Sequence, residues 1–352
     1  MEQTISTLLL NWYDEHKRLL PWRDIRNPYA TWVSETMLQQ TRVETVVDYY
    51  LRFMQRFPDV KALAAAPVED VLKLWEGLGY YRRARNLWAG AQQVMLEFNG
   101  TIPENVEQLK RIKGIGAYTA GAIASIAFGK AVPAVDGNVI RVMSRLYDDH
   151  QMMGTASAQR HMDSLVMENI PEDRPGDFNQ ALMDLGARIC VPGTPDCGNC
   201  PLRSECLALR HATAEQLPVL PTKAKQKEIR YDLLLITDGD RILMRQRTES
   251  LLQGLWVFPM LETKDKPDVL SEQIRKQWKL DVSDLKPAGE AKHVFTHQIW
   301  LMKLYAAQAT VQPVPQGWKW VTIEEMRQLT IPTAMRGALQ AVDTLFHEKN
   351  DI

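Results

Sequence analysis

The segment LKRIKGIGAYTAGAIASIAFGKAVPAVDGNVIRVMSRL occupies residues 109–146 and organises the rest of the chain. Its pattern predicts a helix, a tight glycine hairpin, a second helix, a short extended link and a third helix. Gly114 and Gly116 lie one residue apart, and glycines spaced in this way let a chain turn sharply with positive φ. The hairpin also exposes backbone N–H groups at the start of the next helix, which favours binding of an anion such as phosphate.

Two carboxyl groups lie in contrasting predicted surroundings. Asp136 precedes a helical pattern with apolar residues at Val139, Val142, Met143 and Leu146, so we expect it to cap that helix. Glu35 lies in TWVSETMLQQT, a helix that we expect to begin at Thr31, on a face that is otherwise apolar. Such a glutamate is either a solvated helix residue or a buried acid with a raised pKa, and a partner such as Asp136 favours the second interpretation.

The bulk composition limits the class of protein. A chain of 352 residues is long enough for two or three domains, and 45% hydrophobic with 24% charged residues is typical of globular proteins. The net charge of −1 argues against a broad basic surface, so contact with nucleic acid would have to be local. The sequence shows no signal peptide and no apolar run of about 18 residues, so we expect a cytoplasmic protein without a membrane span.

The four cysteines of the chain all fall within seventeen residues, with the spacing C-x6-C-x2-C-x5-C. Disulfides are not expected in a cytoplasmic chain, and four thiolates without a fifth favour a closed metal site. The spacing is compatible with a [4Fe–4S] cluster and with structural zinc. The ligands in either case are Cys190, Cys197, Cys200 and Cys206.

A loop at residues 77–83, GLGYYRR, combines Leu78 and two tyrosines with arginines. Arginines bind phosphates and apolar side chains can wedge between base steps, so the loop is suited to nucleic acid. An ordinary helix–helix loop with a hydrophobic plug would show the same composition.

The hydrophobic period changes from helical to two beyond a linker at residues 217–228. Asp238-Gly239-Asp240 between two apolar runs is a strong hairpin signal. We expect a separate α+β domain with strands at 229–237, 241–247, 255–258, 293–305 and 318–322 and helices at 267–278 and 331–347.

These features together resemble one family. SETMLQQT, WEGLGYYRRARN, KGIGAYTAGAI, VDGNVIRV and the four-cysteine loop are similar to the helix-hairpin-helix iron–sulfur DNA glycosylases, and among them to the MutY-type adenine DNA glycosylases. The resemblance covers nearly the whole chain and selects [4Fe–4S] over zinc. It implies a mainly α catalytic helix-hairpin-helix domain and a C-terminal α+β Nudix-like domain. The expected boundaries are 1–216 for the catalytic domain (an inner six-helix part at about 30–133, and an iron–sulfur part from the N-terminal helix and 134–216), 217–228 for the linker and 229–352 for the Nudix-like domain.

The resemblance also implies a reaction. The protein would be a monofunctional base-excision-repair glycosylase that flips out adenine mispaired with 8-oxoguanine or G in double-stranded DNA and hydrolyses its N-glycosidic bond. Glu35 would protonate the leaving adenine, Asp136 would stabilise an oxocarbenium-like sugar, and Tyr118 and Asn138 would assist them. Such chemistry needs one carboxyl protonated and the other ionised. We expect the apolar face of Glu35 to raise its pKa and the helix N-terminus at Asp136 to favour the anion.

Further residues match the family by position. Tyr118 replaces the Schiff-base lysine of bifunctional relatives such as the endonuclease III type, which implies that the protein has no efficient lyase activity. The expected DNA-binding residues are Gln40, Leu78 and Tyr80 around the lesion pair, Gly114 and Gly116 in the hairpin, and Arg18, Trp22 and Arg23 in the wall of the adenine pocket. We expect a bacterial, nucleoid-associated protein that acts as a monomer.

The C-terminal segment resembles a Nudix-like module that reads 8-oxoguanine. GLWVFP at 254–259 fits its strand-opening segment, but SEQIRKQWKL at 271–280 lacks the paired glutamates of the metal-binding Nudix box. We therefore expect a reader without hydrolase activity. The family's Phe-Ser-His recognition loop corresponds to Phe295, Thr296 and His297, where threonine keeps the hydroxyl and adds a methyl group.

Other functions fit parts of the sequence. An endonuclease III-type glycosylase/lyase acting on oxidised pyrimidines is disfavoured by Tyr118 and by the additional C-terminal domain. A non-enzymatic DNA-binding scaffold would keep the metal loop but would not need Glu35 or Asp136. A Nudix pyrophosphatase fused to a DNA-binding domain lacks its catalytic box.

Overall fold

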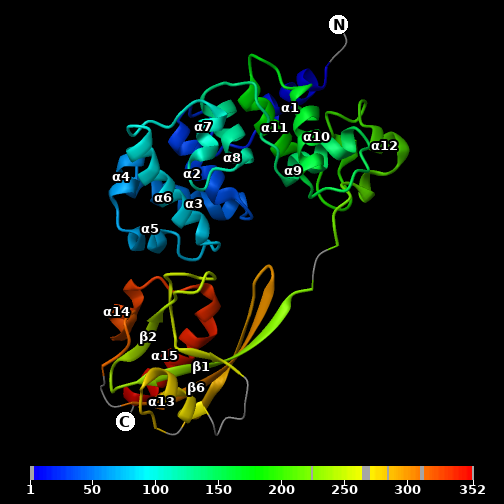
Figure 1. Ribbon diagram of the computed structural model, residues 1–352. Coiled ribbons are helices and arrows are strands. Elements are labelled where there is room, and N and C mark those ends of the chain that lie inside the picture. The colour runs from blue at the N-terminus through cyan, green and yellow to red at the C-terminus, as the bar shows by residue number, and fades with distance from the viewer. Residues whose placement is uncertain (1–3, 223–224, 264–269, 284, 310–312, 351–352) are drawn as a thin grey trace. The chain divides into compact units, whose positions relative to one another are not determined.

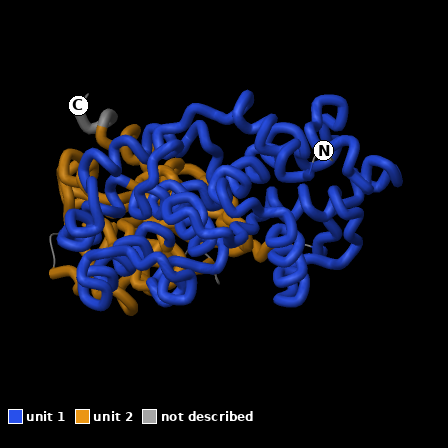
Figure 2. Tube along the Cα trace, turned by 90° about the horizontal axis from the view of Figure 1, so that it is seen from above, with its two compact units in different colours: residues 1–74, 83–222 blue, residues 75–82, 223–352 orange. Residues whose placement is uncertain are grey.

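The computed structural model describes residues 4–222, 225–263, 270–283, 285–309 and 313–350 (Figure 1). The chain divides into two compact units, which Figure 2 shows in different colours. Unit 1 contains Met1–Leu74 and Arg83–Thr222, and unit 2 contains Trp75–Arg82 and Lys223–Ile352. None of the helices in the described ranges is long and apolar enough to cross a membrane.

The regular elements in the described residues of unit 1 are all helical. Buried residues of α1, α9, α10 and α11 share one hydrophobic core, so the N-terminal helix packs with helices far along the chain. The helices are α1 (Ile5–His16), α2 (Pro28–Leu38), α3 (Val43–Arg56), α4 (Val60–Ala65), α5 (Val68–Leu74), α6 (Arg82–Glu97), α7 (Val106–Arg111), α8 (Ala117–Ala122), a π-helical turn (Ile123–Ala127), α9 (Gly137–Leu146), α10 (Ala156–Met167), α11 (Pro175–Arg188) and α12 (Leu207–His211).

Helix α2, which carries Glu35, begins three residues before the predicted start at Thr31. Asn27 caps it by accepting hydrogen bonds from the backbone N–H groups of Tyr29 and Ala30, and Pro28 occupies the first turn. Proline is well suited to that position because its missing N–H would have no helical partner there. The early start makes Glu35 the eighth residue of the helix rather than the fifth.

The predicted glycine hairpin joins α7 to α8. Gly114 has a φ of +90°, and a Cβ there would lie 2.9 Å from the Cβ of Asn86. Gly116 differs from the prediction, because its φ is −89° and it caps α8 in an extended conformation. The sharp turn therefore depends on Gly114, whereas Gly116 leaves open space in front of the helix start.

The link between the second hairpin helix and Asp136 is fixed by a buried asparagine. Asn179 of α11 is fully buried and donates hydrogen bonds to the hydroxyl of Ser125 and the carbonyl of Val132, each over 2.9 Å. Its side-chain oxygen accepts a bond of 3.1 Å from the N–H of Ala134. Helix α11 thus holds the backbone two residues before Asp136.

Unit 2 contains a mixed sheet with helices on both faces. Buried side chains of β1 alternate between two cores, one shared with α14 and α15 and the other with α13. The sheet order is β3-β2-β1-β6-β5, with β4 paired to β1 and β7 to β2. The elements are β1 (Lys227–Thr237), β2 (Ile242–Gln246), β3 (Trp256–Val257), β4 (Met260–Glu262), α13 (Leu270–Trp278), β5 (Lys286–Val294), β6 (Gln298–Gln308), β7 (Trp318–Val321), α14 (Ile323–Gln328) and α15 (Arg336–Asn350).

The single strand predicted at 293–305 is wrong. The structure has two antiparallel strands, β5 and β6, and Phe295, Thr296 and His297 form the turn between them. The N–H of Phe295 closes the turn by donating to the carbonyl of Gln298 over 2.8 Å. Part of the helix predicted at 267–278 lies outside the described residues, and its described part begins at Leu270.

Candidate active site

Glu35 is a buried acid that is held by a tyrosine. Its side chain on α2 is enclosed, and the residue is 5% exposed. Tyr118 of α8 donates its hydroxyl hydrogen to a carboxylate oxygen of Glu35. Burial raises the pKa of Glu35 to about 7, the bond from Tyr118 opposes this rise, and the charge of Asp136 adds to it. Glu35 is therefore suited to donate a proton near neutral pH.

Asp136 caps α9 and has more hydrogen-bond donors than Glu35. It accepts bonds from the N–H of Val139 over 2.8 Å and from the amide of Asn138 over 3.0 Å. Burial nevertheless raises the pKa of Asp136, which corrects the expectation that the helix N-terminus would make the anion dominant. The bonds from Val139 and Asn138 oppose that rise, because they stabilise the carboxylate.

The two carboxyl groups differ in how well each can hold a negative charge. Glu35 is buried and Asp136 is half-buried, and the charge of Asp136 disfavours ionisation of Glu35. Glu35 has one side-chain donor, Tyr118, whereas Asp136 accepts from two groups of its own helix. This arrangement favours a proton on Glu35 and a charge on Asp136.

Arg18 and Arg23, two of the predicted pocket residues, converge on a buried acid that the sequence analysis missed. Asp184 of α11 is fully buried and pairs with Arg18 at 2.5 Å and with Arg23 at 2.6 Å. The charge of Arg23 lowers the pKa of Glu35. Trp22 is also buried, with its ring 5.1 Å from that of Tyr50. The signal available in the sequence was that Asp184 is the only acid in FNQALMDLG, residues 178–186, with apolar neighbours on both sides.

The other predicted DNA-binding residues differ in their exposure to solvent. Gln40 is exposed at the end of α2 with a φ of +60°. Leu78 is buried, and Tyr80 is 48% exposed. Arg83, which the loop composition suggested for phosphate, instead donates to the carbonyls of Thr36 and Met37 and caps α2.

The predicted recognition residues form the β5–β6 turn in unit 2. Phe295 packs against Trp300 and His293, with ring centroids 4.8 and 4.5 Å away. Thr296 and His297 are exposed. The hydroxyls of Thr296 and Tyr80, which both belong to unit 2, are 2.9 Å apart.

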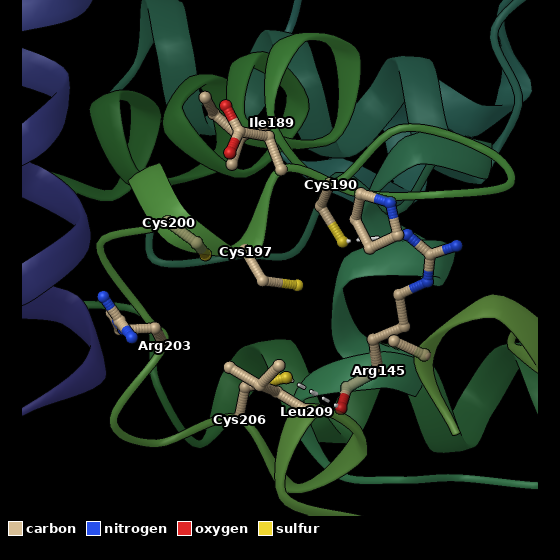
Figure 3. A pocket seen from close by; sticks show the side chains of 11 residues that line it. Arg145, Ile189, Cys190, Cys197, Cys200, Arg203, Cys206 and Leu209 are labelled. Carbon is tan, nitrogen blue, oxygen red and sulfur yellow. Dashed lines mark hydrogen bonds between the residues drawn. The ribbon is translucent and has the colours of Figure 1, made fainter. Parts of the chain in front are cut away.

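The four cysteines line one pocket together with Arg145 and Arg203 (Figure 3). Arg145 donates to the sulfur of Cys190 over 3.4 Å and to the carbonyl of Val191 over 2.8 Å. Burial raises the pKa of Cys197, Cys200 and Cys206, and neighbouring thiolates add to the rise. In the described ranges, no group of three or more His, Cys, Asp or Glu side chains is arranged to hold a metal ion.

Arg141, which the sequence analysis also missed, connects the cysteine loop to the carboxylates. Its Nε donates to the carbonyl of Cys190 over 2.7 Å, and its Nη2 donates to the side-chain oxygen of Asn138 over 2.9 Å. Asn138 in turn donates to Asp136. The position of Asp136 therefore depends on the loop that holds Cys190.

Comparisons with known proteins agree with this architecture. Residues 33–168 match the family model of the HhH-GPD superfamily base excision DNA repair proteins, and residues 232–341 match a NUDIX domain. The structure of a thermostable thymine-DNA glycosylase is similar with a TM-score of 0.53 and 27% identity, covering 58% of this chain and 95% of that one.

Similar sequences extend over both units. The adenine DNA glycosylase of Mus musculus is 37% identical over 93% of this chain and 76% of its own length. That of Buchnera aphidicola subsp. Acyrthosiphon pisum is 32% identical over 84% of this chain and 83% of its own. The chain therefore belongs to the adenine DNA glycosylases, base-excision-repair enzymes of the HhH-GPD superfamily.

Proposed function

We propose that the enzyme hydrolyses the N-glycosidic bond of adenine mispaired with 8-oxoguanine or G, after the adenine has been flipped out of the duplex. The observation that carries the proposal is the pair of a buried Glu35 and a half-buried Asp136 with unequal hydrogen bonding. Loss of a purine requires a proton for the leaving base and a negative charge beside the sugar. Flipping is needed because the reactive bond is not accessible within the stacked duplex.

The steps follow from the two carboxyl groups. Glu35 transfers its proton to adenine while the bond between base and sugar breaks, and the electrons of that bond leave with the base. Asp136 stabilises the oxocarbenium-like sugar until water adds to it and loses a proton. Tyr118 orients Glu35, and Asn138 orients Asp136. Tyr118 offers no amine for a Schiff base, which supports a monofunctional glycosylase.

The remaining contacts with DNA are assigned to residues whose positions in the sequence match those of the family. The hairpin with Gly114 and Gly116 would bind a DNA phosphate, and the wall of the adenine pocket would include Arg18, Trp22 and Arg23. Residues that would meet the lesion pair are Gln40, Leu78, Tyr80, Phe295, Thr296 and His297. The exposure of Tyr80, Thr296 and His297 supports their assignment.

We assign a [4Fe–4S] cluster to Cys190, Cys197, Cys200 and Cys206. Four thiols on one pocket form the complete ligand set of such a cluster, which supplies cationic iron that stabilises the thiolates when bound. A four-iron cluster also spreads its ligands over several iron atoms, which suits thiols that line a pocket rather than surround one ion.

The cluster assignment predicts the metal content of the protein. The purified enzyme is expected to contain about four iron atoms per chain and no stoichiometric zinc. Cys200→Ser should lose most of this iron because it removes one ligand, whereas Ser204→Ala in the same loop should keep it. Elemental analysis and visible absorbance measure both. One zinc ion per chain would contradict the assignment.

The proposed function is tested by single-turnover release of adenine from duplexes that contain one 8-oxoguanine:A, G:A or T:A pair. Release from the first two, with an abasic strand left unnicked, is the expected result. Cleavage of oxidised pyrimidines with a Schiff base trapped by borohydride would instead support the lyase class.

Tyr118→Phe is expected to move the alkaline limb of the rate profile to higher pH. The hydroxyl of Tyr118 stabilises ionised Glu35 and so lowers its pKa, and its removal should raise that pKa further. Since Glu35 acts in its protonated form, the rate should persist to higher pH even if its maximum falls. Single-turnover rates between about pH 6 and 9 measure the shift. An unchanged limb would mean that Tyr118 does not act on Glu35.

A further inference from the structure

The chain enters the sheet of unit 2 beside the β5–β6 turn at residues 295–297, which we call the recognition turn. Strands β1 and β6 are parallel, with Lys227 opposite Gln298. The first residue of β1 therefore lies next to the first residue after the turn, and the N–H of Lys227 donates to the carbonyl of His297 over 3.2 Å. The residues that end the linker are thus neighbours of the recognition turn.

Gln226, immediately before β1, bonds to the backbone of that turn. Its side-chain amide donates to the carbonyl of Phe295 over 2.6 Å and lies 3.5 Å from the carbonyl of Thr296. These carbonyls belong to the peptide groups on either side of Thr296. The side chain of Gln226 therefore holds the backbone that orients the Thr296 hydroxyl.

The turn is also supported by an aromatic contact. Phe295 packs against Trp300, which is fully buried, and the guanidinium of Arg247 lies 5.2 Å from the centre of the Trp300 ring. Phe295 is thus anchored through its ring, whereas Thr296 and His297 are exposed. The two peptide groups next to Thr296 could still rotate, and the side chain of Gln226 limits that rotation.

We propose that Gln226 is a positioning residue for recognition of the base opposite adenine. The inference rests on the proposed function, in which the turn reads 8-oxoguanine. A hydrogen bond weakens steeply when its donor is displaced or rotated, so a turn held in one conformation discriminates better between two similar bases. Gln226 acts through Thr296 and does not itself contact the base.

The test compares variants that differ in whether they can donate a hydrogen bond. Gln226→Glu has nearly the same shape but presents only acceptors at neutral pH, Gln226→Ala lacks the group, and Gln226→Lys keeps a donor of similar reach. Gln308→Ala is the matched control, since Gln308 is an exposed glutamine at the far end of β6. Each is made in the full chain with Glu35→Gln so that turnover is slow during the binding measurement.

The readout is the ratio of the dissociation constants for G:A and 8-oxoguanine:A duplexes at one salt concentration. The charge introduced at position 226 changes the affinity for both duplexes equally, so it cancels in the ratio. The ratio should fall about threefold to tenfold in Gln226→Glu and Gln226→Ala, as expected for one hydrogen bond. Gln226→Lys should stay within about twofold of the native ratio, and Gln308→Ala should match it.

Two outcomes would overturn the proposal, and they are distinguishable. If the native chain prefers 8-oxoguanine and all four variants keep its ratio, Gln226 has no positioning role while the proposed function stands. If the native chain binds both duplexes equally, the reading of 8-oxoguanine by the turn fails, and the role of Gln226 fails with it. Circular dichroism melting of each variant shows whether unit 2 remains folded.

Discussion

Glu35→Gln is expected to slow single-turnover release of adenine by about 10³-fold, because a positioned general acid contributes a factor of this size. Glutamine has the shape of glutamic acid but cannot give up a proton. The native rate should fall above about pH 7 as Glu35 ionises, since its raised pKa lies there. The residual rate of the Glu35→Gln variant should not show this fall above about pH 7.

The matched control for this prediction is Glu44→Gln on α3, where the glutamate is exposed. It should release adenine at the native rate. Gel-shift affinity for an 8-oxoguanine:A duplex should be similar in all three proteins, which separates chemistry from binding. A Glu35→Gln enzyme that retains more than about a tenth of the native rate would show that another group supplies the proton.

Asp184→Asn is expected to destabilise unit 1 by about 3–5 kcal/mol, the usual cost of breaking a buried ion pair. Asp184 is fully buried and is the shared counter-charge of Arg18 and Arg23, and the Arg23 side chain is 7% exposed. The neutral amide would leave these guanidinium groups without a counter-charge in a medium of low polarity. Urea unfolding followed by helical circular dichroism measures the loss.

Asp70→Asn is the control for this stability prediction. Asp70 pairs with Arg56 at 3.4 Å, but both side chains are about half exposed. Exposed pairs contribute about 0–1 kcal/mol, so unfolding of this variant should resemble that of the native chain. Equal effects of the two substitutions would show that Asp184 does not act through burial of its charge.

Features that depend on residues nearby in the sequence were predictable. The apolar face around Glu35 indicated a buried acid with a raised pKa, and the structure has both. The position of Asp136 before an amphipathic pattern indicated a helix cap, which is also present. The direction of its pKa shift was not predictable, because desolvation in the folded protein outweighs the local hydrogen bonds.

Features that depend on distant partners could not be derived. Asp184 is 166 residues from Arg18, and the local pattern of α11 does not indicate which cation it meets. The same holds for Asn179, whose partners lie more than 40 residues away. The alternation of apolar and polar residues also could not distinguish one long strand from the two strands β5 and β6. This alternation has the same period of two on either side of the Phe295–His297 turn.

The parallel pairing of β1 and β6 determines where a fragment of this enzyme can begin. The NUDIX family match begins at Asp232, five residues into β1. A recombinant fragment cut there would lose the strand segment that pairs with Gln298–Met302. The exposed edge of β6 would then be free to pair with other copies, so such a fragment should aggregate. A soluble fragment of unit 2 has to start upstream of Gln226.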